Sequence, residues 1–117
     1  MAVSKKEISE CPIDAMLQVI DGRWKGTILW RLSEGPMRAG DLKRSILGIT
    51  ERMLIRHLND LVRDGIVVRS REKAAHPRVF YSISEYGWTL VPVLEVICAW
   101  GRRRLELKKS ECTTAVP

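Results

Sequence analysis

The sequence lacks the features that mark secreted, disulfide-stabilised and membrane-spanning proteins. Its longest apolar stretch, residues 88–101, contains Pro92 and Glu95 and falls short of the ~20 residues that a transmembrane helix needs. No secretory apolar region follows the basic pair at residues 5–6, so we expect a cytoplasmic protein with no membrane contact. The three cysteines are odd in number and show no CxxC spacing, which argues against a disulfide framework and against a zinc site.

The short motifs of common enzymes are absent as well. The chain contains no GxSxG elbow, no GxxxxGK phosphate loop, no HExxH pair and no GxGxxG turn. Its two histidines, His57 and His76, have no further ligands at metal-binding spacing. We therefore expect a protein that is not an enzyme and that holds no metal or other cofactor. A thiol peroxidase of unusual type, with Cys11 as its nucleophile, is the enzymatic alternative.

The composition is that of a small folded domain with a positive charge. A length of 117 residues, 45% hydrophobic and 29% charged, fits one compact domain. Lys and Arg total 20 against 14 Asp and Glu, which gives a formal net charge of +6. Ten of these cations but only five of the acids lie between Arg38 and Arg78. A positive charge concentrated in this segment favours a polyanionic partner, nucleic acid first.

Hydrophobic periodicity predicts a mainly α-helical fold with one β-hairpin. Apolar residues at three- and four-residue steps predict helices at residues 11–20, 25–33, 41–46 and 51–64, and β-branched and aromatic runs predict strands at 66–72 and 78–83. Ser84 can cap a last helix from Glu85 to about Leu107, with a kink or a break at Pro92. We expect a flexible N-terminal segment at residues 1–10, a single domain at 11–108 and a flexible tail at 109–117.

The helix expected at residues 51–64 has two distinct faces. Leu54, Leu58 and Leu61 share the side that should meet the core. The opposite side carries Arg52, Arg56, Asn59 and Arg63. Exposed helix faces are often charged for solubility alone, but here a short helix precedes this one and a basic hairpin follows it. This order predicts a winged helix-turn-helix, whose second helix enters the DNA major groove.

The residue types on this surface suit contacts with double-stranded DNA. An Arg can donate two hydrogen bonds to guanine O6 and N7, and an isoleucine can touch a thymine methyl group. The candidates for base edges are Thr50, Arg52, Ile55 and Arg56, and the candidates for the backbone are Asn59 and Arg63. Further candidate DNA-binding residues are Arg38 and, on the hairpin, Arg71, Lys73, His76 and Arg78. An ordinary polar hairpin is the alternative interpretation of the last four residues.

The last expected helix has more apolar surface than one core contact requires. Its apolar residues span an arc of roughly 220° on a wheel turned 100° per residue, about twice a single core-facing stripe. The same helix from a second copy is the expected cover, which predicts a homodimer that reads an inverted repeat. The candidate dimer-interface residues are Ile13, Leu17, Val93, Val96, Ile97 and Trp100.

These residues resemble the HxlR-type winged helix-turn-helix transcriptional regulators of bacteria and archaea, relatives of the MarR group. The resemblance covers residues 11–101. It is carried by the ordered set Cys11-Pro12, Gly22-Arg23-Trp24-Lys25, Gly35-Pro36-Met37-Arg38, Gly48-Ile49-Thr50, Asp64-Gly65, Pro77-Arg78-Val79-Phe80-Tyr81, Gly87, Pro92-Val93-Leu94 and Trp100-Gly101. Two departures are Ala39, where the family usually has an aromatic residue, and the absence of a Pro-rich wing.

The resemblance implies a homodimeric DNA-binding regulator, either a repressor or an activator. Several relatives sense electrophiles or oxidants through a cysteine just before the first helix, and Cys11 occupies that position. The positive potential of a helix N-terminus favours a thiolate there, which suits redox sensing of a small electrophile or aldehyde. An idle cysteine at this position is the alternative, and Cys98 is expected to be inert core. The four tryptophans either line an effector pocket or simply pack in the core.

A protein of another class also fits a winged helix. Some winged helices serve only as protein-interaction or scaffold modules without specific DNA readout. A protein-binding face should be more apolar and less cationic than one that carries Arg52 and Arg56. We therefore expect a sequence-specific DNA-binding transcriptional regulator and keep the scaffold module as the alternative.

Overall fold

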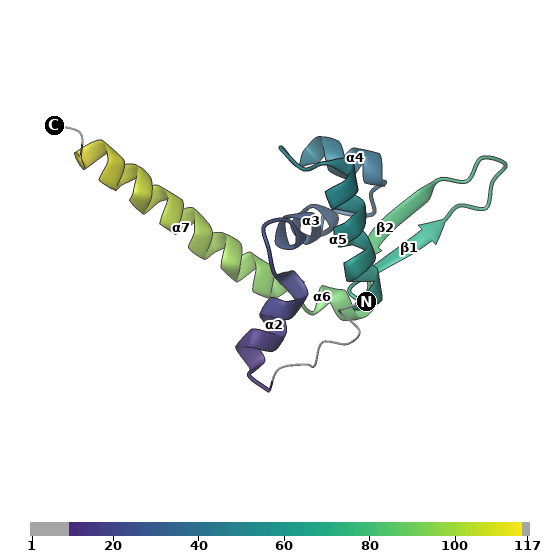
Figure 1. The fold of residues 1–117 in the computed structure, drawn as a ribbon, viewed down its shortest axis with the longest axis horizontal. Coiled ribbons are helices and arrows are strands. Elements are labelled where there is room, and N and C mark those ends of the chain that lie inside the picture. The colour runs from purple at the N-terminus through teal and green to yellow at the C-terminus, as the bar shows by residue number, and fades with distance from the viewer. Residues whose placement is uncertain (1–9, 116–117) are drawn as a thin grey trace.

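The computed structural model describes residues 10–115 of the chain, and Figure 1 shows how its elements are arranged. The predicted N-terminal flexible segment therefore lies almost entirely outside the described residues. The elements in order are α2 (Pro12–Ile20), α3 (Lys25–Leu32), α4 (Ala39–Ser45), α5 (Glu51–Arg63), β1 (Val67–Arg71), β2 (Val79–Ile83), α6 (Glu85–Trp88) and α7 (Val91–Ala115). This is the predicted fold, mainly α-helical with one hairpin, and the helix-turn-helix is formed by α4 and α5.

Local hydrogen bonds set where α5 and α6 begin. The hydroxyl oxygen of Thr50 accepts a hydrogen bond from the Met53 N–H at 3.1 Å, which satisfies one of the unpaired donors at the start of α5. Gly65 follows α5 at a φ of +78°, a conformation that glycine adopts without a steric penalty. The Ser84 hydroxyl accepts from the Gly87 N–H at 2.8 Å and donates to the Gly65 carbonyl at 2.6 Å, so one side chain fixes both α6 and the end of α5.

Backbone hydrogen bonds at Met37 connect the hairpin to the helices. β1 and β2 pair antiparallel, with Val67 opposite Ile83 and Arg71 opposite Val79. Met37, just before α4, exchanges two backbone hydrogen bonds with Tyr81, at 3.0 and 2.8 Å. The hairpin is thereby held beside the helix-turn-helix and extends away from it as a wing (Figure 1).

One hydrophobic core lies beneath α5. The most deeply buried side chains are those of Ile28, Leu29, Leu32, Leu42, Leu54, Leu58 and Leu61. Burying an aliphatic side chain of this size contributes about 1.5–3 kcal/mol, so the three leucines of α5 fix its orientation firmly. They confirm the predicted inner face of this helix.

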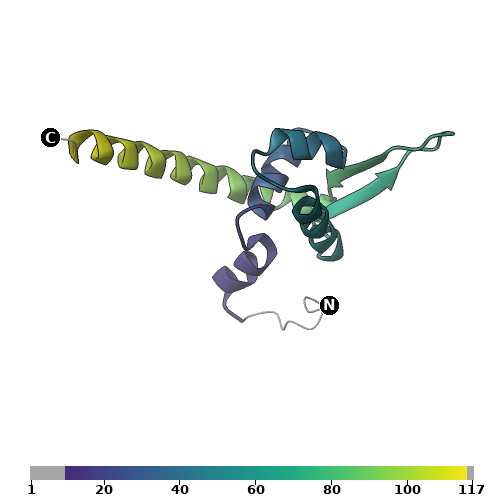
Figure 2. The same cartoon turned by 45° about the horizontal axis from the view of Figure 1, so that its top comes forward.

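The expected last helix has a break, which is one of the two predicted alternatives at Pro92, and it ends later than predicted. The predicted last helix is divided into α6 and α7, and Pro92 is the second residue of α7, where its missing N–H costs no helical hydrogen bond. α7 then continues to Ala115 and so includes most of the predicted tail. Figure 2 shows it extending away from the other elements.

Cys98, predicted to be core, is only half-buried. No helix in residues 10–115 is both long and apolar enough to cross a bilayer.

Candidate nucleic-acid interface

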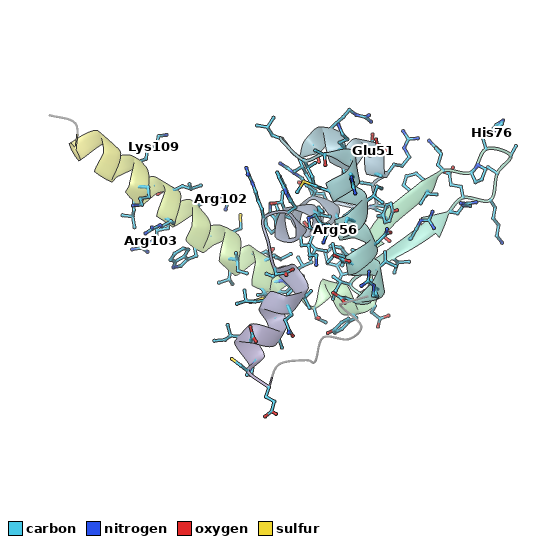
Figure 3. The ribbon with its side chains drawn as sticks, in the orientation of Figure 1. Glu51, Arg56, His76, Arg102, Arg103 and Lys109 are labelled. Atoms are coloured by element: carbon cyan, nitrogen blue, oxygen red, sulfur yellow. The ribbon has the colours of Figure 1, made fainter. Side chains whose placement is uncertain are left out.

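The outer face of α5 carries an exposed row of polar side chains. Arg52, Arg56, Asn59 and Arg63 are all exposed, opposite the buried leucines. Figure 3 shows Arg56 on this helix, and the wing lies to one side of it. Arg52 and Arg56 form no hydrogen bond or ion pair within the part of the chain that the structure describes. Their guanidinium donors are therefore available to a ligand.

Two other candidates for base contacts, Thr50 and Ile55, use part of their side chains for contacts within the protein. The Thr50 oxygen accepts the capping hydrogen bond from Met53, which leaves its O–H as a donor. Ile55 packs against the core and exposes only part of its side chain. Both residues therefore lie beside Arg52 and Arg56 but add no charge to this face of α5.

Arg38 and Arg44 are bridged by a single carboxylate. Asp41, in the first turn of α4, pairs with Arg38 at 3.6 Å and forms a short contact with Arg44. The guanidinium of Arg38 is thus half-exposed but already paired. Exposed ion pairs of this kind are weak, so a phosphate can compete for this arginine.

The wing contains a second paired arginine. Glu72 accepts two hydrogen bonds from the Arg78 guanidinium, at 2.9 and 3.0 Å, and these bonds lower the pKa of the Glu72 carboxyl. The Arg78 guanidinium also lies 5.7 Å from the Phe80 ring centroid. Arg71, Lys73 and His76 are exposed, and Figure 3 shows His76 near the tip of the hairpin. The structure therefore leaves Arg71 and Lys73 more accessible than Arg78.

A buried ion-pair network lies behind α5, and it was not predicted from the sequence. The Lys25 ammonium lies 3.3 Å from Asp21 and 3.4 Å from Asp60, and its side chain is only 7% exposed. Asp60 also pairs with Arg63 at 3.2 Å. The spacing of Asp21 and Lys25 by four residues was a visible signal for the first pair. The pair with Asp60 depends on tertiary packing, which periodicity does not reveal.

His57 lies at the edge of the same network. Burial lowers the pKa of His57, and the nearby positive charge of Lys25 lowers it further. Its Nδ1 atom is buried and has no hydrogen-bond partner among the described residues. The same part of the chain has no group of three or more His, Cys, Asp or Glu side chains placed to hold a metal ion.

A separate apolar surface lies on α2 and α7. The six candidate dimer-interface side chains are all exposed in the single chain, among them Val96 at 69%, Trp100 at 68% and Ile13 at 68%. Cys11 is exposed at the N-cap position of α2, beside this surface. Large exposed apolar side chains that gather on two helices are typical of an interaction site.

The tryptophans differ in their exposure. Trp24 is buried in the core, whereas Trp88 and Trp100 are exposed. A cavity of about 230 Å³ lies between α2, α6 and the start of the wing, lined by Ala15, Met16, Val19, Ile66, Tyr86, Thr89 and Leu90.

Comparison with known proteins gives consistent matches over most of the chain. Residues 19–109 match the family model described as HxlR-like helix-turn-helix. The uncharacterised HTH-type transcriptional regulator YkvN of Bacillus subtilis (strain 168) is 40% identical over 101 residues, which cover 86% of each chain. The solved structure of the redox regulator HypR in its reduced form matches with a TM-score of 0.79 and 35% identity, covering 86% of this chain and 99% of that one. The reduced form of the transcriptional regulator YodB from B. subtilis matches with a TM-score of 0.70 and 29% identity, covering 79% and 91%.

Proposed function

Because the chain belongs to the HxlR-like helix-turn-helix family of transcriptional regulators, we propose that it acts as a homodimer that reads an inverted repeat through α5. In this proposal Arg52 and Arg56 contact base edges in the major groove, and Thr50 and Ile55 contribute at the same end of the helix. Asn59 and Arg63 meet the DNA backbone, as do Arg38 and the wing residues Arg71, Lys73, His76 and Arg78.

The observation that carries the proposal is the pair of unoccupied guanidinium groups on a rigid helix. Arg52 and Arg56 have no hydrogen bond or ion pair in the described residues, and the leucines beneath α5 are completely buried. A helix held in this way fixes the backbone positions from which both side chains reach a base edge, where an arginine can donate two hydrogen bonds to guanine. A scaffold module would have little use for two unpaired cations on the same face.

The apolar surface of α2 and α7 supports a second copy of the chain as the partner. A twofold pair of α7 helices would cover Val93, Val96, Ile97 and Trp100, and α2 would add Ile13 and Leu17. Two α5 helices would then face successive major grooves about 34–36 Å apart. Replacement of Trp100 by Glu should convert the dimer to a monomer in sedimentation velocity. Wild-type chain that sediments as a monomer at micromolar concentration would contradict the dimer.

Cys11 is proposed as a sensor of small electrophiles or aldehydes. It is exposed at the N-cap position of α2, and the matched protein HypR is described as a redox regulator. When Cys11 adds to a quinone, the sulfur–carbon bond forms as the conjugated C=C π bond breaks, and the electron pair moves to the quinone oxygen. That oxygen takes a proton from water, the thiol proton passes to solvent, and transfer of the ring proton through solvent to the second quinone oxygen gives a hydroquinone thioether on Cys11. The expected result is release of bound DNA by a quinone in the wild type but not in Cys11→Ser. Equal release from both proteins would exclude this role.

The DNA-binding proposal is tested by titrating duplexes that carry the DNA flanking the gene, at several salt concentrations. Arg56→Ala should cost about 1–3 kcal/mol of binding free energy and relax the preference at one base pair. Arg103→Ala, on α7 and away from α5 in Figure 3, is the matched control and should bind like the wild type. An affinity loss that is uniform across sequences would make Arg56 a phosphate contact. Wild-type protein without salt-dependent duplex binding would favour the scaffold module.

A further inference from the structure

Arg23 is an exposed cation with an ordered side chain, and it is not among the predicted DNA contacts. It lies in the loop between α2 and α3, where its guanidinium carbon is 4.6 Å from the centroid of the Trp24 ring. A guanidinium stacked on a ring keeps its N–H donors at the rim of the group. The stack therefore restricts the side chain while leaving its hydrogen-bonding edge available.

The two residues after Arg23 anchor this loop to the helix-turn-helix. Trp24 is buried, and its Cη2 atom lies 3.6 Å from the position that a Cβ would occupy at Gly48, in the turn that precedes α5. Lys25 is buried and pairs with Asp60 of α5 at 3.4 Å. Arg23 is thus held in a fixed position relative to the start of α5 and to its second half.

The loop lies on the flank of α5 that the wing leaves uncovered. In Figures 1 and 2 the loop from α2 to α3 and the hairpin are on opposite sides of α5. A helix of about 10–12 Å diameter fills a major groove of about 12 Å width, so a phosphate backbone runs along each of its flanks. The wing carries cations on one flank of α5, and the loop that contains Arg23 lies on the other flank.

The charges around Arg23 favour an anionic ligand. The acid in the same loop is Asp21, and its carboxylate pairs with the Lys25 ammonium at 3.3 Å. An arginine presents its donors in a fork that matches phosphate oxygens. We infer that Arg23 binds a phosphate of the DNA backbone on the flank of α5 opposite the wing. This inference rests on the proposed DNA-binding function.

The test compares wild-type protein with Arg23→Gln on two duplexes of equal length. One carries the DNA flanking the gene, and the other is the same composition scrambled. Loss of one phosphate contact should reduce the slope of log K against log salt by about 0.9 and weaken binding to both duplexes about tenfold. Arg23→Lys keeps the charge and should keep the wild-type slope. Arg103→Gln, with the same loss of charge on α7, should leave the slope unchanged.

Each outcome separates this inference from the function it rests on. If the wild-type protein shows no salt-dependent binding to either duplex, the proposed DNA-binding function itself is wrong. Wild-type binding with an unchanged slope in Arg23→Gln would overturn only the role of Arg23. A loss confined to the unscrambled duplex would also overturn it, because a phosphate contact carries no sequence preference. If Arg23→Gln proves unfolded by circular dichroism, Arg23→Met, which keeps the aliphatic stem beside Trp24 but removes the charge, takes its place. An unchanged slope in folded Arg23→Met would overturn the inference.

Discussion

The Lys25 ammonium lies 3.4 Å from a carboxylate oxygen of Asp60, and this buried contact joins the start of α3 to α5. The Lys25 side chain is 7% exposed and that of Asp60 is 18% exposed, so neither charge is well solvated. A buried ammonium without a partner is strongly unfavourable. The pair therefore favours the one packing of α5 against α3 in which both charges are satisfied.

Replacement of Asp60 by Asn should lower the free energy of unfolding by about 1–3 kcal/mol, because Lys25 then retains only the more exposed Asp21. Lys25→Met should cost less, since Asp60 then keeps its pair with Arg63 and Asp21 is largely exposed to water. Urea unfolding measures both. Asp64→Asn, at the end of the same helix and outside the ion pairs of the described residues, is the matched control and should change stability little. Equal stability of Asp60→Asn and the control would show that the pair does not hold the helices.

Gly87 is the position at which an added methyl group should be least tolerated. A Cβ there would overlap the Ile66 carbonyl oxygen and approach the Ile83 Cγ2 atom to 2.9 Å. Gly87→Ala should destabilise the protein by about 1–3 kcal/mol through overpacking. Gly26→Ala, where a Cβ in α3 meets nothing within 4 Å, should be neutral or stabilising by up to about 1 kcal/mol. Thermal unfolding of both variants checks the difference in sign.

Stability should fall as the solution is acidified, in part because of His57. Its pKa is lowered in the folded protein by burial and then by the charge of Lys25, so the unfolded chain takes up a proton first. The contribution of neutral His57 to the free energy of unfolding is fully present above about pH 6.5, the ordinary pKa of histidine. It is lost as the pH falls toward the lower pKa of His57 in the folded protein. His57→Gln should flatten the stability profile between pH 7 and 5. His76→Gln, at the exposed hairpin tip, should leave the profile as in the wild type.

The helices and the faces of α5 follow from the sequence because they depend on local periodicity. Thr50 as a cap, the three inward leucines and the outward arginines all lie within one helix and its first turn. The pattern of hydrophobic and polar side chains therefore determines them without knowledge of the rest of the fold. The predicted bounds of α5 and of the two strands agree with the structure within one residue at most ends.

Contacts between elements were not predictable in the same way. The Lys25–Asp60 pair needs the packing of α3 against α5, and the stack of Arg23 on Trp24 needs the loop conformation at Gly22, whose φ is +81°. The division between α6 and α7 falls before Pro92, because proline is accepted in the first turn of a helix. The pair of Glu72 and Arg78 was within reach of the sequence, since both residues flank the hairpin loop where the strands pair.

Glu72 should limit how tightly the wing binds DNA. Its carboxylate holds Arg78 through two hydrogen bonds, which also lower the pKa of the Glu72 carboxyl, so a DNA phosphate has to compete with Glu72 for the same guanidinium. Glu72→Gln should weaken this competition and raise affinity for scrambled duplex. The salt slope should become steeper by up to about 0.9, the value of one added phosphate contact.

The control for this prediction must change the net charge by the same amount at a distant place. Glu95→Gln, exposed on α7, removes one negative charge without touching the wing. If Glu72→Gln and Glu95→Gln raise affinity equally, the effect comes from net charge alone and Arg78 is not being released. A gain specific to Glu72→Gln that disappears in Glu72→Gln combined with Arg78→Gln would trace the added contact to Arg78, because only that guanidinium is freed by the first substitution.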